Sequence, residues 1–285
     1  FLPWDKDLAF GGIQENDLNV HPLHGDAAHP AVYVDANLET WNHLINALYD
    51  TPAIREMYLR RLRTLMDRFL QPPDTPVATR YFEAQIDNYL ELMTIDAALD
   101  AAKWKPANDM QSATDWIKTN SLDARREHLY SVHSAASGGI IPNEQAADVT
   151  LEFVEVHCTG EGGSHESEYF VLYNPNRLAV DISGWTVSGD IDYTFQAGVV
   201  IPGRSEVTVS KDVTAFRARI AGRRGGQGHF VQGGYQGRLN DDGGTLYLRN
   251  RRNAAVASIT FEQDIALQGA YVEESTIYLP MIVSR

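Results

Sequence analysis

The chain has 285 residues, with 24 Lys and Arg against 38 Asp and Glu, a formal net charge of −14 at pH 7. This acidic balance argues against a nucleic-acid-binding protein, because phosphate binding needs a concentrated basic face. Hydrophobic residues make up 44% of the chain, enough for one or two real cores, which excludes a disordered protein. The single cysteine, Cys158, excludes an intrachain disulfide, and no apolar run approaches the roughly 18 residues of a membrane span.

Two carboxylates lie one residue apart near the start, in Phe1-Leu2-Pro3-Trp4-Asp5-Lys6-Asp7-Leu8-Ala9-Phe10-Gly11. In an extended segment, Asp5 and Asp7 would point to the same side, because side chains alternate with a period of two. Two such oxygen ligands could bind a hard divalent cation, usually together with the phosphates of a nucleotide. The Asp-x-Asp pair alone is better explained by a solvated acidic turn.

The pattern Pro-Trp-Asp-x-Asp-x-x-Phe-Gly resembles the metal-binding loop of the spore-coat CotH kinase family, secreted atypical kinases with a protein-kinase-like fold. The resemblance implies Mg²⁺ with ATP as cofactor, Asp5 as the first metal ligand and Asp7 as the second. Lys6 departs from the apolar residue expected there. In a kinase the phosphate lid, the Lys and the catalytic Asp precede this loop. We therefore expect a C-terminal part of a longer protein, inactive in phosphate transfer by itself, whose catalytic residues stay unknown.

Loop-forming residues dominate the next stretch, 12–37, which also carries His21, His24 and His29. Three imidazoles so close together could hold zinc or another transition metal. The spacing matches no strict motif, so we interpret this stretch as a surface loop.

Apolar residues then recur at helical spacing. They predict four helices, from near Asp35 to Leu48, about 52–70, about Thr79 to Ala102, and roughly Ser112 to Val132. In the second helix we expect a solvated arginine face, with an acidic partner as the alternative, formed by Arg55, Arg60, Arg61, Arg63 and Arg68. In the third helix we expect these residues to point inward: Phe82, Ile86, Tyr89, Leu90 and Met93.

Residues 54–67 and 125–130 resemble the C-terminal lobe of the CotH family, so this resemblance spans about 1–133. Residues 134–139 have the small, uncharged composition of a linker. Beyond them, short strands separated by Gly, Pro, Asn and Asp predict an all-β sandwich with Trp185 in its core. The expected strands are 149–156, 169–173, 185–188, 193–195, 199–201, 207–209, 245–249 and 256–261.

The segments 168–176, 180–185, 191–195, 200–203, 237–248 and 256–259 resemble a lamin tail domain. This resemblance covers about 149–262 and implies an immunoglobulin-like sandwich without an enzymatic site. Bacterial CotH-like proteins often carry this domain after the kinase, so the order agrees with the first resemblance.

Candidate sites within the second half are weaker. Calcium could bind at Asp190 and Asp192, or at Asn240, Asp241 and Asp242, although turns use the same residues. We expect core packing for His157 and Cys158, which lack an evident third group. We expect no hydrolase at Ser164 and His165, which lack an ordered acid partner. We expect a solvated face, rather than an anion site, at Arg217, Arg219, Arg223 and Arg224. The glycines in 222–234 could form a phosphate-binding loop, but the Lys-Ser/Thr pair that ends such a loop is not present there.

Together these patterns predict an α+β chain of two domains. We expect a helical kinase-like C-terminal-lobe segment at 1–133, a linker at 134–148, and the sandwich with an apolar last strand at 149–285. The expected function is that of the C-terminal portion of a secreted bacterial CotH-like Ser/Thr kinase, at the cell surface or outside it. The alternative is a non-catalytic structural or adhesion module that binds a protein substrate or a surface partner through the sandwich.

Overall fold

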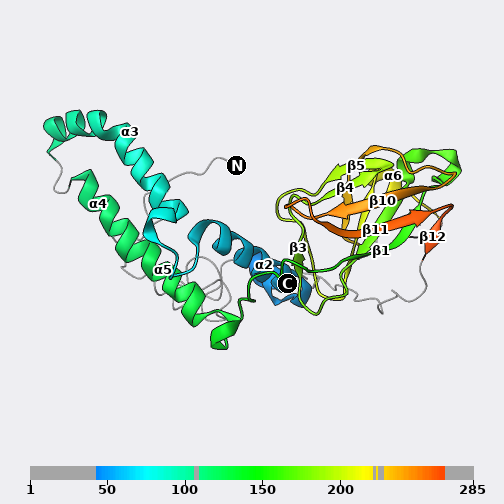
Figure 1. The fold of residues 1–285 in the computed structure, drawn as a ribbon, viewed down its shortest axis with the longest axis horizontal. Coiled ribbons are helices and arrows are strands. Elements are labelled where there is room, and N and C mark those ends of the chain that lie inside the picture. The colour runs from blue at the N-terminus through cyan, green and yellow to red at the C-terminus, as the bar shows by residue number, and fades with distance from the viewer. Residues whose placement is uncertain (1–42, 106–108, 221–222, 224–227, 267–285) are drawn as a thin grey trace, which may run out of the picture. The chain divides into compact units, whose positions relative to one another are not determined.

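A computed structural model of the chain describes residues 43–105, 109–220, 223 and 228–266 (Figure 1). Helices occupy the first half of these residues and strands the second, which confirms the predicted α+β class. The described residues form two spatial units, 43–46 with 62–144 and 47–61 with 145–266. The predicted domain boundaries stay a prediction, but the N-terminal part of the second helix, through Arg61, packs with the sandwich.

The helical elements follow the predicted order. They are α1 (His43–Asp50), α2 (Pro52–Leu65), η1 (Met66–Leu70), η2 (Val77–Thr79), α3 (Tyr81–Trp104), α4 (Met110–Trp116), η3 (Ile117–Leu122), α5 (Asp123–Glu127), η4 (His128–Val132) and η5 (Ala135–Ser137). The widened π-helical turns η1, η3 and η4 continue the α-helices before them. Asp109 begins α4 as an N-cap, because its carboxylate accepts a 2.7 Å hydrogen bond from the Ser112 backbone N–H.

The predicted inward face of α3 is wrong for three of its residues. Phe82, Tyr89 and Met93 are exposed, with 59% of Tyr89 accessible, whereas Ile86 and Leu90 are half-buried. Periodic spacing predicts which face of a helix is apolar, but burial requires a second element to cover that face. Element η1 gives only partial cover: the Phe69 ring lies 6.3 Å from that of Phe82, which stays exposed.

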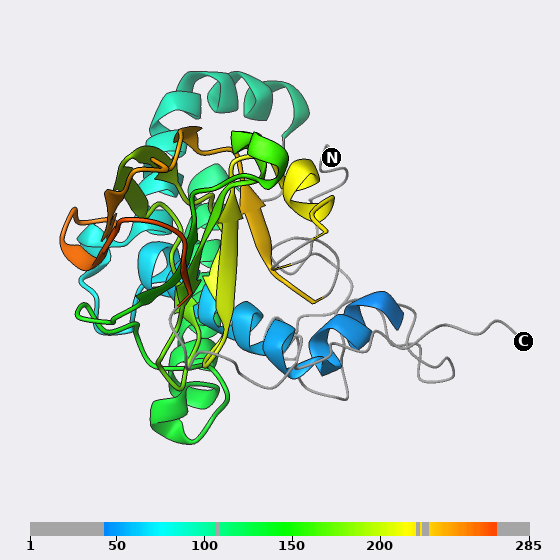
Figure 2. The same ribbon diagram turned by 90° about the vertical axis from the view of Figure 1, so that its right-hand side faces the viewer.

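The described residues of the second half form two five-stranded sheets and a two-stranded ribbon. Figure 2 shows these strands after a 90° turn from the view of Figure 1. One sheet has the order β12-β1-β2-β7-β8, the other β11-β10-β4-β5-β9, and β3 pairs with β6. The strands are β1 (Glu152–His157), β2 (Tyr169–Tyr173), β3 (Val180–Asp181), β4 (Thr186–Gly189), β5 (Ile191–Thr194), β6 (Val200–Ile201), β7 (Glu206–Ser210), β8 (Val231–Gly233), β9 (Gln236–Gly237), β10 (Gly244–Arg249), β11 (Ala255–Phe261) and β12 (Ile265–Ala266). Strands β7 and β8 pair in parallel, and the other described pairs are antiparallel.

Both five-stranded sheets contribute to one apolar core, as in an immunoglobulin-like sandwich. Phe170 and Val209 are register partners in β2 and β7, and Val187 and Leu248 in β4 and β10. Trp185 is 5% exposed within this core, which confirms its predicted place.

Strand β2 is buried on both faces, because a short helix covers the face that points away from the core. This helix, α6 (Val213–Arg217), places Phe216 against Tyr169, with ring centroids 5.1 Å apart. Val154 and Val171 complete this second, smaller cluster. The continuous apolar run of β2 in the sequence is therefore explained by two packed faces rather than one.

The stretch that we interpreted as a linker has local structure. Ser134 forms a parallel bridge with Ile141, and the Ile141 side chain is fully buried. The Ser134 hydroxyl also accepts a hydrogen bond from the Ala136 backbone N–H.

Candidate functional site

The metal loop predicted from the sequence lies outside the described residues. This applies to Asp5 and Asp7, to the three histidines His21, His24 and His29, and to the apolar segment 277–283. Their roles stay predictions.

Helix α2 packs on the sandwich through two of the arginines that we expected to be solvated. Arg60 is 3% exposed, and its Nε donates to the carbonyl oxygen of Ala179 at 3.0 Å. Arg61 Nη1 donates at 3.0 Å to the Asp181 carboxylate and to the Ser183 hydroxyl. The solvated-face prediction is therefore wrong for both arginines, and the alternative of an acidic partner holds for Arg61.

A glycine allows a third contact of α2 with the sandwich. Both carboxylate oxygens of Glu56 accept from the Gly203 backbone N–H at 3.2 Å. A Cβ at position 203 would lie 2.3 Å from the carbonyl oxygen of Arg177 and 3.1 Å from Glu56 Oε1. Only glycine, which has no Cβ, lets the backbone at position 203 lie so close to the Arg177 carbonyl oxygen and the Glu56 carboxylate.

Arg63 points instead into the helical unit, so the solvated-face prediction is wrong there too. Its Nε donates to Asp67 at 2.8 Å, and the Tyr130 hydroxyl donates to the same carboxylate at 3.0 Å. Burial and the neighbouring Asp67 raise the pKa of Tyr130, which keeps its hydroxyl protonated as a donor. Arg55 and Arg68 are exposed, as predicted.

A buried ion network joins α3 to α5. Arg126 donates to Glu83 at 2.7 Å and to Asp123 at 2.6 Å, and Arg80 donates to Asp123 at 2.7 Å. Arg126 Nε also approaches the carbonyl oxygens of Leu70 and Gln71 at 3.0 Å. Two cations and two anions compensate each other, so the network is a structural support within the segment that resembles the CotH lobe.

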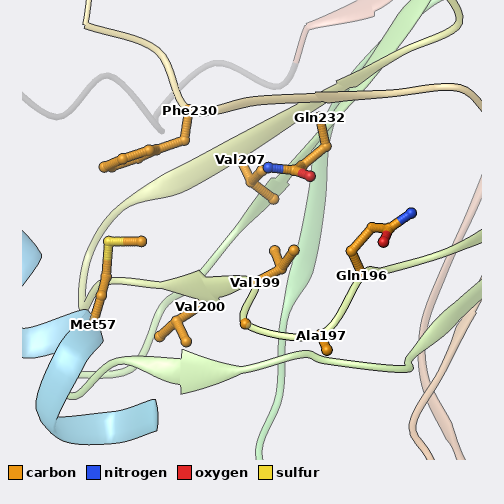
Figure 3. Close-up of a pocket in the computed structure, with 9 residues that line it drawn as sticks. Met57, Gln196, Ala197, Val199, Val200, Val207, Phe230 and Gln232 are labelled. Atoms are coloured by element: carbon orange, nitrogen blue, oxygen red, sulfur yellow. The ribbon is translucent and has the colours of Figure 1, made fainter. Parts of the chain in front are cut away.

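A cavity of about 270 Å³ lies where α2 meets the sandwich edge within the same unit (Figure 3). Figure 3 shows Met57 projecting from α2 below the Phe230 ring, with the Gln196 and Gln232 amides nearby. Valines complete the lining, together with Ala197 and Gly198. None of these lining residues carries a titratable or nucleophilic group, so the cavity has no means of acid–base catalysis.

Cys158 and His157 share a third group that the sequence analysis missed. The fully buried Cys158 thiol donates to Asp264 Oδ1 at 3.3 Å, and His157 Nδ1 lies 2.5 Å from Asp264 Oδ2. Burial and the Asp264 carboxylate raise the pKa of the Cys158 thiol to about 11. The thiol therefore stays protonated near neutral pH, which agrees with the predicted core packing.

His165 does have an acid partner, so the premise that it lacks one is wrong. Its Nδ1 contacts Oε1 of Glu168, whose side chain is fully buried. Ser164 acts as the N-cap of a one-turn helix, η7 (His165–Ser167), where its hydroxyl accepts from the Glu166 backbone N–H at 3.4 Å. Asp241 brings a carboxylate oxygen to the same place.

The other acidic candidates form a turn. The backbone N–H of Asn240 donates to Asp190 Oδ2, and the Asn240 side-chain oxygen accepts from Asp242 N–H, both at 3.2 Å. The backbone N–H of Gly243 donates to the Asn240 carbonyl oxygen at 3.0 Å. These bonds support the turn interpretation of Asn240 and Asp242.

The basic cluster is paired rather than solvated at two of its positions, so that prediction is wrong there. Arg219 is 5% exposed, donates to the Ser167 carbonyl oxygen at 2.9 Å and stacks over the Tyr169 ring. Arg223 forms ion pairs with Glu155 and Glu206. Arg217 is exposed, and Arg224 lies outside the described residues.

The structure first defines the class of protein: a helical segment followed by an immunoglobulin-like sandwich, against which part of helix α2 packs. Residues 1–123 match the family model described as CotH kinase protein, and residues 144–263 match the Lamin Tail Domain. The chain therefore carries a CotH kinase segment followed by a lamin tail domain, which confirms both resemblances and their order. No curated protein matches the chain. Among the described residues, none of the helices has the length and apolarity that a membrane crossing requires.

Proposed function

We propose that this chain is part of a secreted CotH-type kinase that transfers the γ-phosphate of ATP to a Ser or Thr of an extracellular or surface protein. The observation that carries the proposal is the CotH match over residues 1–123, which includes the Pro3-Trp4-Asp5-x-Asp7-x-x-Phe10-Gly11 pattern.

The donor chemistry of this pattern fits the cofactor. Carboxylate oxygens are ligands that Mg²⁺ prefers in protein sites that bind nucleotide phosphates. When bound, the ion would neutralise charge on the phosphates of ATP. Asp5 would be its first protein ligand and Asp7 the second.

Calorimetric titration with ATP, with and without Mg²⁺, tests this role. We expect the chain to bind ATP only with Mg²⁺, and Asp5→Asn or Asp5→Ala to weaken binding by about tenfold or more, ~1.4 kcal/mol. Asp7→Asn should have a smaller effect. Asp17→Asn, an acidic residue of the same N-terminal stretch, is the matched control and should bind like the unmodified chain. Equal and negligible binding by the unmodified chain and all of these variants would overturn the nucleotide role and favour a non-catalytic module.

One observation favours a second role, in which the sandwich is a non-catalytic binding module. The sandwich holds a helix through Arg60, Arg61 and Glu56, so it has a surface suited to a helical segment. We propose that the sandwich attaches the protein to its substrate or to a cell surface. In a co-sedimentation assay with intact cells of the producing organism, attachment should survive Asp5→Asn and be lost when Trp185→Ala disrupts the sandwich core. Failure of the unmodified chain to sediment with the cells would contradict this role.

A further inference from the structure

Three potential metal ligands from two separate segments meet in the sandwich. His165 lies in η7 and Glu168 directly after it, while Asp241 lies in the turn between β9 and β10. One ligand atom of each residue, a ring nitrogen or a carboxylate oxygen, lies within 4.8 Å of the others. Two atoms bound to one ion at about 2.0–2.2 Å lie at most about 4.4 Å apart, so small side-chain movements would let one ion contact all three.

The first two ligands are oriented by their local structure. In a 3₁₀ turn, side chains three residues apart eclipse each other, which places Glu168 beside His165. The Glu168 Oε2 atom accepts from the Leu239 backbone N–H at 2.9 Å and from the Tyr235 hydroxyl at 3.4 Å. The other oxygen, Oε1, is therefore the one turned towards His165. In metal sites, hydrogen bonds to the ligand atom that does not contact the ion fix the orientation of the ligand in this way.

The charge of Glu168 is poorly compensated. Its side chain is fully buried, and the donors on it are the neutral Leu239 N–H and Tyr235 hydroxyl, beside the His165 ring. A buried carboxylate is stable in its charged form only with a cation or several donors nearby. A divalent ion between Glu168 and His165 would supply that compensation.

The third ligand is presented by a fixed backbone. Around Asp241, the hydrogen bonds of Asn240 with Asp190 and Asp242 close the turn. The Asn240 side-chain oxygen is used in this turn. Asp241 is exposed, and its carboxylate is the one of this turn that lies with His165 and Glu168.

We propose that His165, Glu168 and Asp241 bind a divalent transition-metal ion such as Zn²⁺. One imidazole with two carboxylates suits zinc, cobalt or nickel, whereas calcium and magnesium prefer oxygen ligands throughout. The ion would tie η7 to the β9–β10 turn, and three protein ligands leave a fourth position for water or a ligand atom of a partner.

One neighbouring cation competes with the ion. Arg238 Nη1 lies 3.3 Å from His165 Nε2, and this arginine is exposed. Removing its positive charge should strengthen metal binding, whereas a site that is only an ion pair between His165 and Glu168 would give no such gain.

Titration of the full chain with Zn²⁺ by calorimetry, and with Co²⁺ by its visible absorption, tests the proposal. The chain should carry no histidine tag and should have His21, His24 and His29 replaced by Gln, which removes the three clustered histidines of the N-terminal stretch. We expect one equivalent of Zn²⁺ or Co²⁺ to bind, with no comparable binding of Ca²⁺ or Mg²⁺. His165→Gln and Asp241→Asn should each weaken Zn²⁺ binding by about tenfold or more, and Arg238→Gln should strengthen it.

The matched control is Asp242→Asn, an exposed neighbour outside the cluster, which should bind Zn²⁺ like its parent. Glu168→Gln is less suitable because a buried substitution could unfold the sandwich; His165 and Asp241 are accessible, and circular dichroism verifies their fold. Excess Zn²⁺ should also raise the Tm of the parent but not of Asp241→Asn. Equal Zn²⁺ affinity in Asp241→Asn and Asp242→Asn, or no binding by the parent, would overturn the proposal.

Discussion

A single buried asparagine side chain supplies hydrogen bonds to backbone carbonyls in an irregular part of the sandwich. Asn174 is fully buried, and its Nδ2 lies within 3.1 Å of the carbonyl oxygens of Leu178, Ile201 and Pro202. Its side-chain oxygen accepts from the Asn176 backbone N–H at 3.0 Å. A buried carbonyl without a hydrogen bond is destabilising, and in a regular strand a neighbouring strand would supply that bond. Here the side chain of one asparagine supplies it to three carbonyls. This is a physical reason for the Asn-Pro-Asn segment through which the sequence resembles a lamin tail domain.

The environment of Cys158 predicts an unreactive thiol. With a pKa of about 11, roughly 0.1% of the thiol is ionised at pH 8, and the side chain is fully buried. We expect alkylation by iodoacetamide at pH 8 to be about a hundredfold slower than for a cysteine in a short peptide. Because the pKa is raised, the rate should keep increasing as the pH approaches 11 while the fold persists. Mass spectrometry measures both; labelling at the peptide rate would contradict the buried, protonated thiol.

At the scale of elements, α2 is the helix whose pattern is least informative about its packing. Its arginines alternate with apolar residues in the way that surface helices do. Arg60 and Arg61 are held by the sandwich, Arg63 is held within the helical unit, and Arg55 is exposed. The same residue type on one helix thus has three environments, and those of Arg60 and Arg61 are set by partners distant in the sequence.

Substitution of Arg61 tests the attachment of α2. Arg61→Met leaves the Asp181 carboxylate, whose side chain is 2% exposed, without its cation. We expect the unfolding free energy of the sandwich to fall by about 1.5–3 kcal/mol, the usual contribution of a hydrogen bond to a charged group. Urea unfolding followed by circular dichroism and tryptophan fluorescence measures the loss.

The control for this substitution is Arg55→Met, an exposed arginine of the same helix, expected to change stability by about 0.5 kcal/mol or less. In a double-mutant cycle, Asp181→Asn should lose much of its effect in the Arg61→Met background. Equal effects of Arg55→Met and Arg61→Met would show that the ion pair contributes nothing measurable.

At the scale of the whole molecule, the two units do not coincide with the two family segments. Residues 47–61 lie within the CotH match, yet they belong to the same spatial unit as the lamin tail domain. By contrast, α3 carries large exposed apolar side chains, such as Leu92 and Ile95, both 76% accessible. Stability should therefore follow the spatial units rather than the family boundaries.

Hydrogen exchange measured by mass spectrometry tests this distribution. Amides of residues 53–61 in α2 should be protected nearly as well as those of β2, because their unit opens cooperatively. Amides of residues 90–100 in α3 should exchange much faster, since few buried contacts oppose local opening. Fast exchange throughout α2 would contradict its inclusion in the sandwich unit, and slow exchange in α3 would show that another segment or chain covers it.

Local patterns predicted most of the elements in their order, but not the short elements β3, α6, β8, β9 and β12. Helical periodicity predicted 52–70 and 112–132, and alternation between turn residues predicted strands such as 169–173, because both signals depend on neighbouring residues. Trp185 was predictable as a core residue for the same reason, and the two family segments were recognisable from short motifs.

The sequence by itself therefore determined the longer helices and strands, their order and the core residue Trp185, because hydrophobic periodicity is a local property. Only the tertiary structure decided which polar groups meet. Arg61 reaches Asp181, Cys158 reaches Asp264, and Asp241 joins His165 and Glu168. Each of these contacts joins residues far apart in the chain. The charge and spacing of residues along the sequence carry no information about which of them lie close together in space.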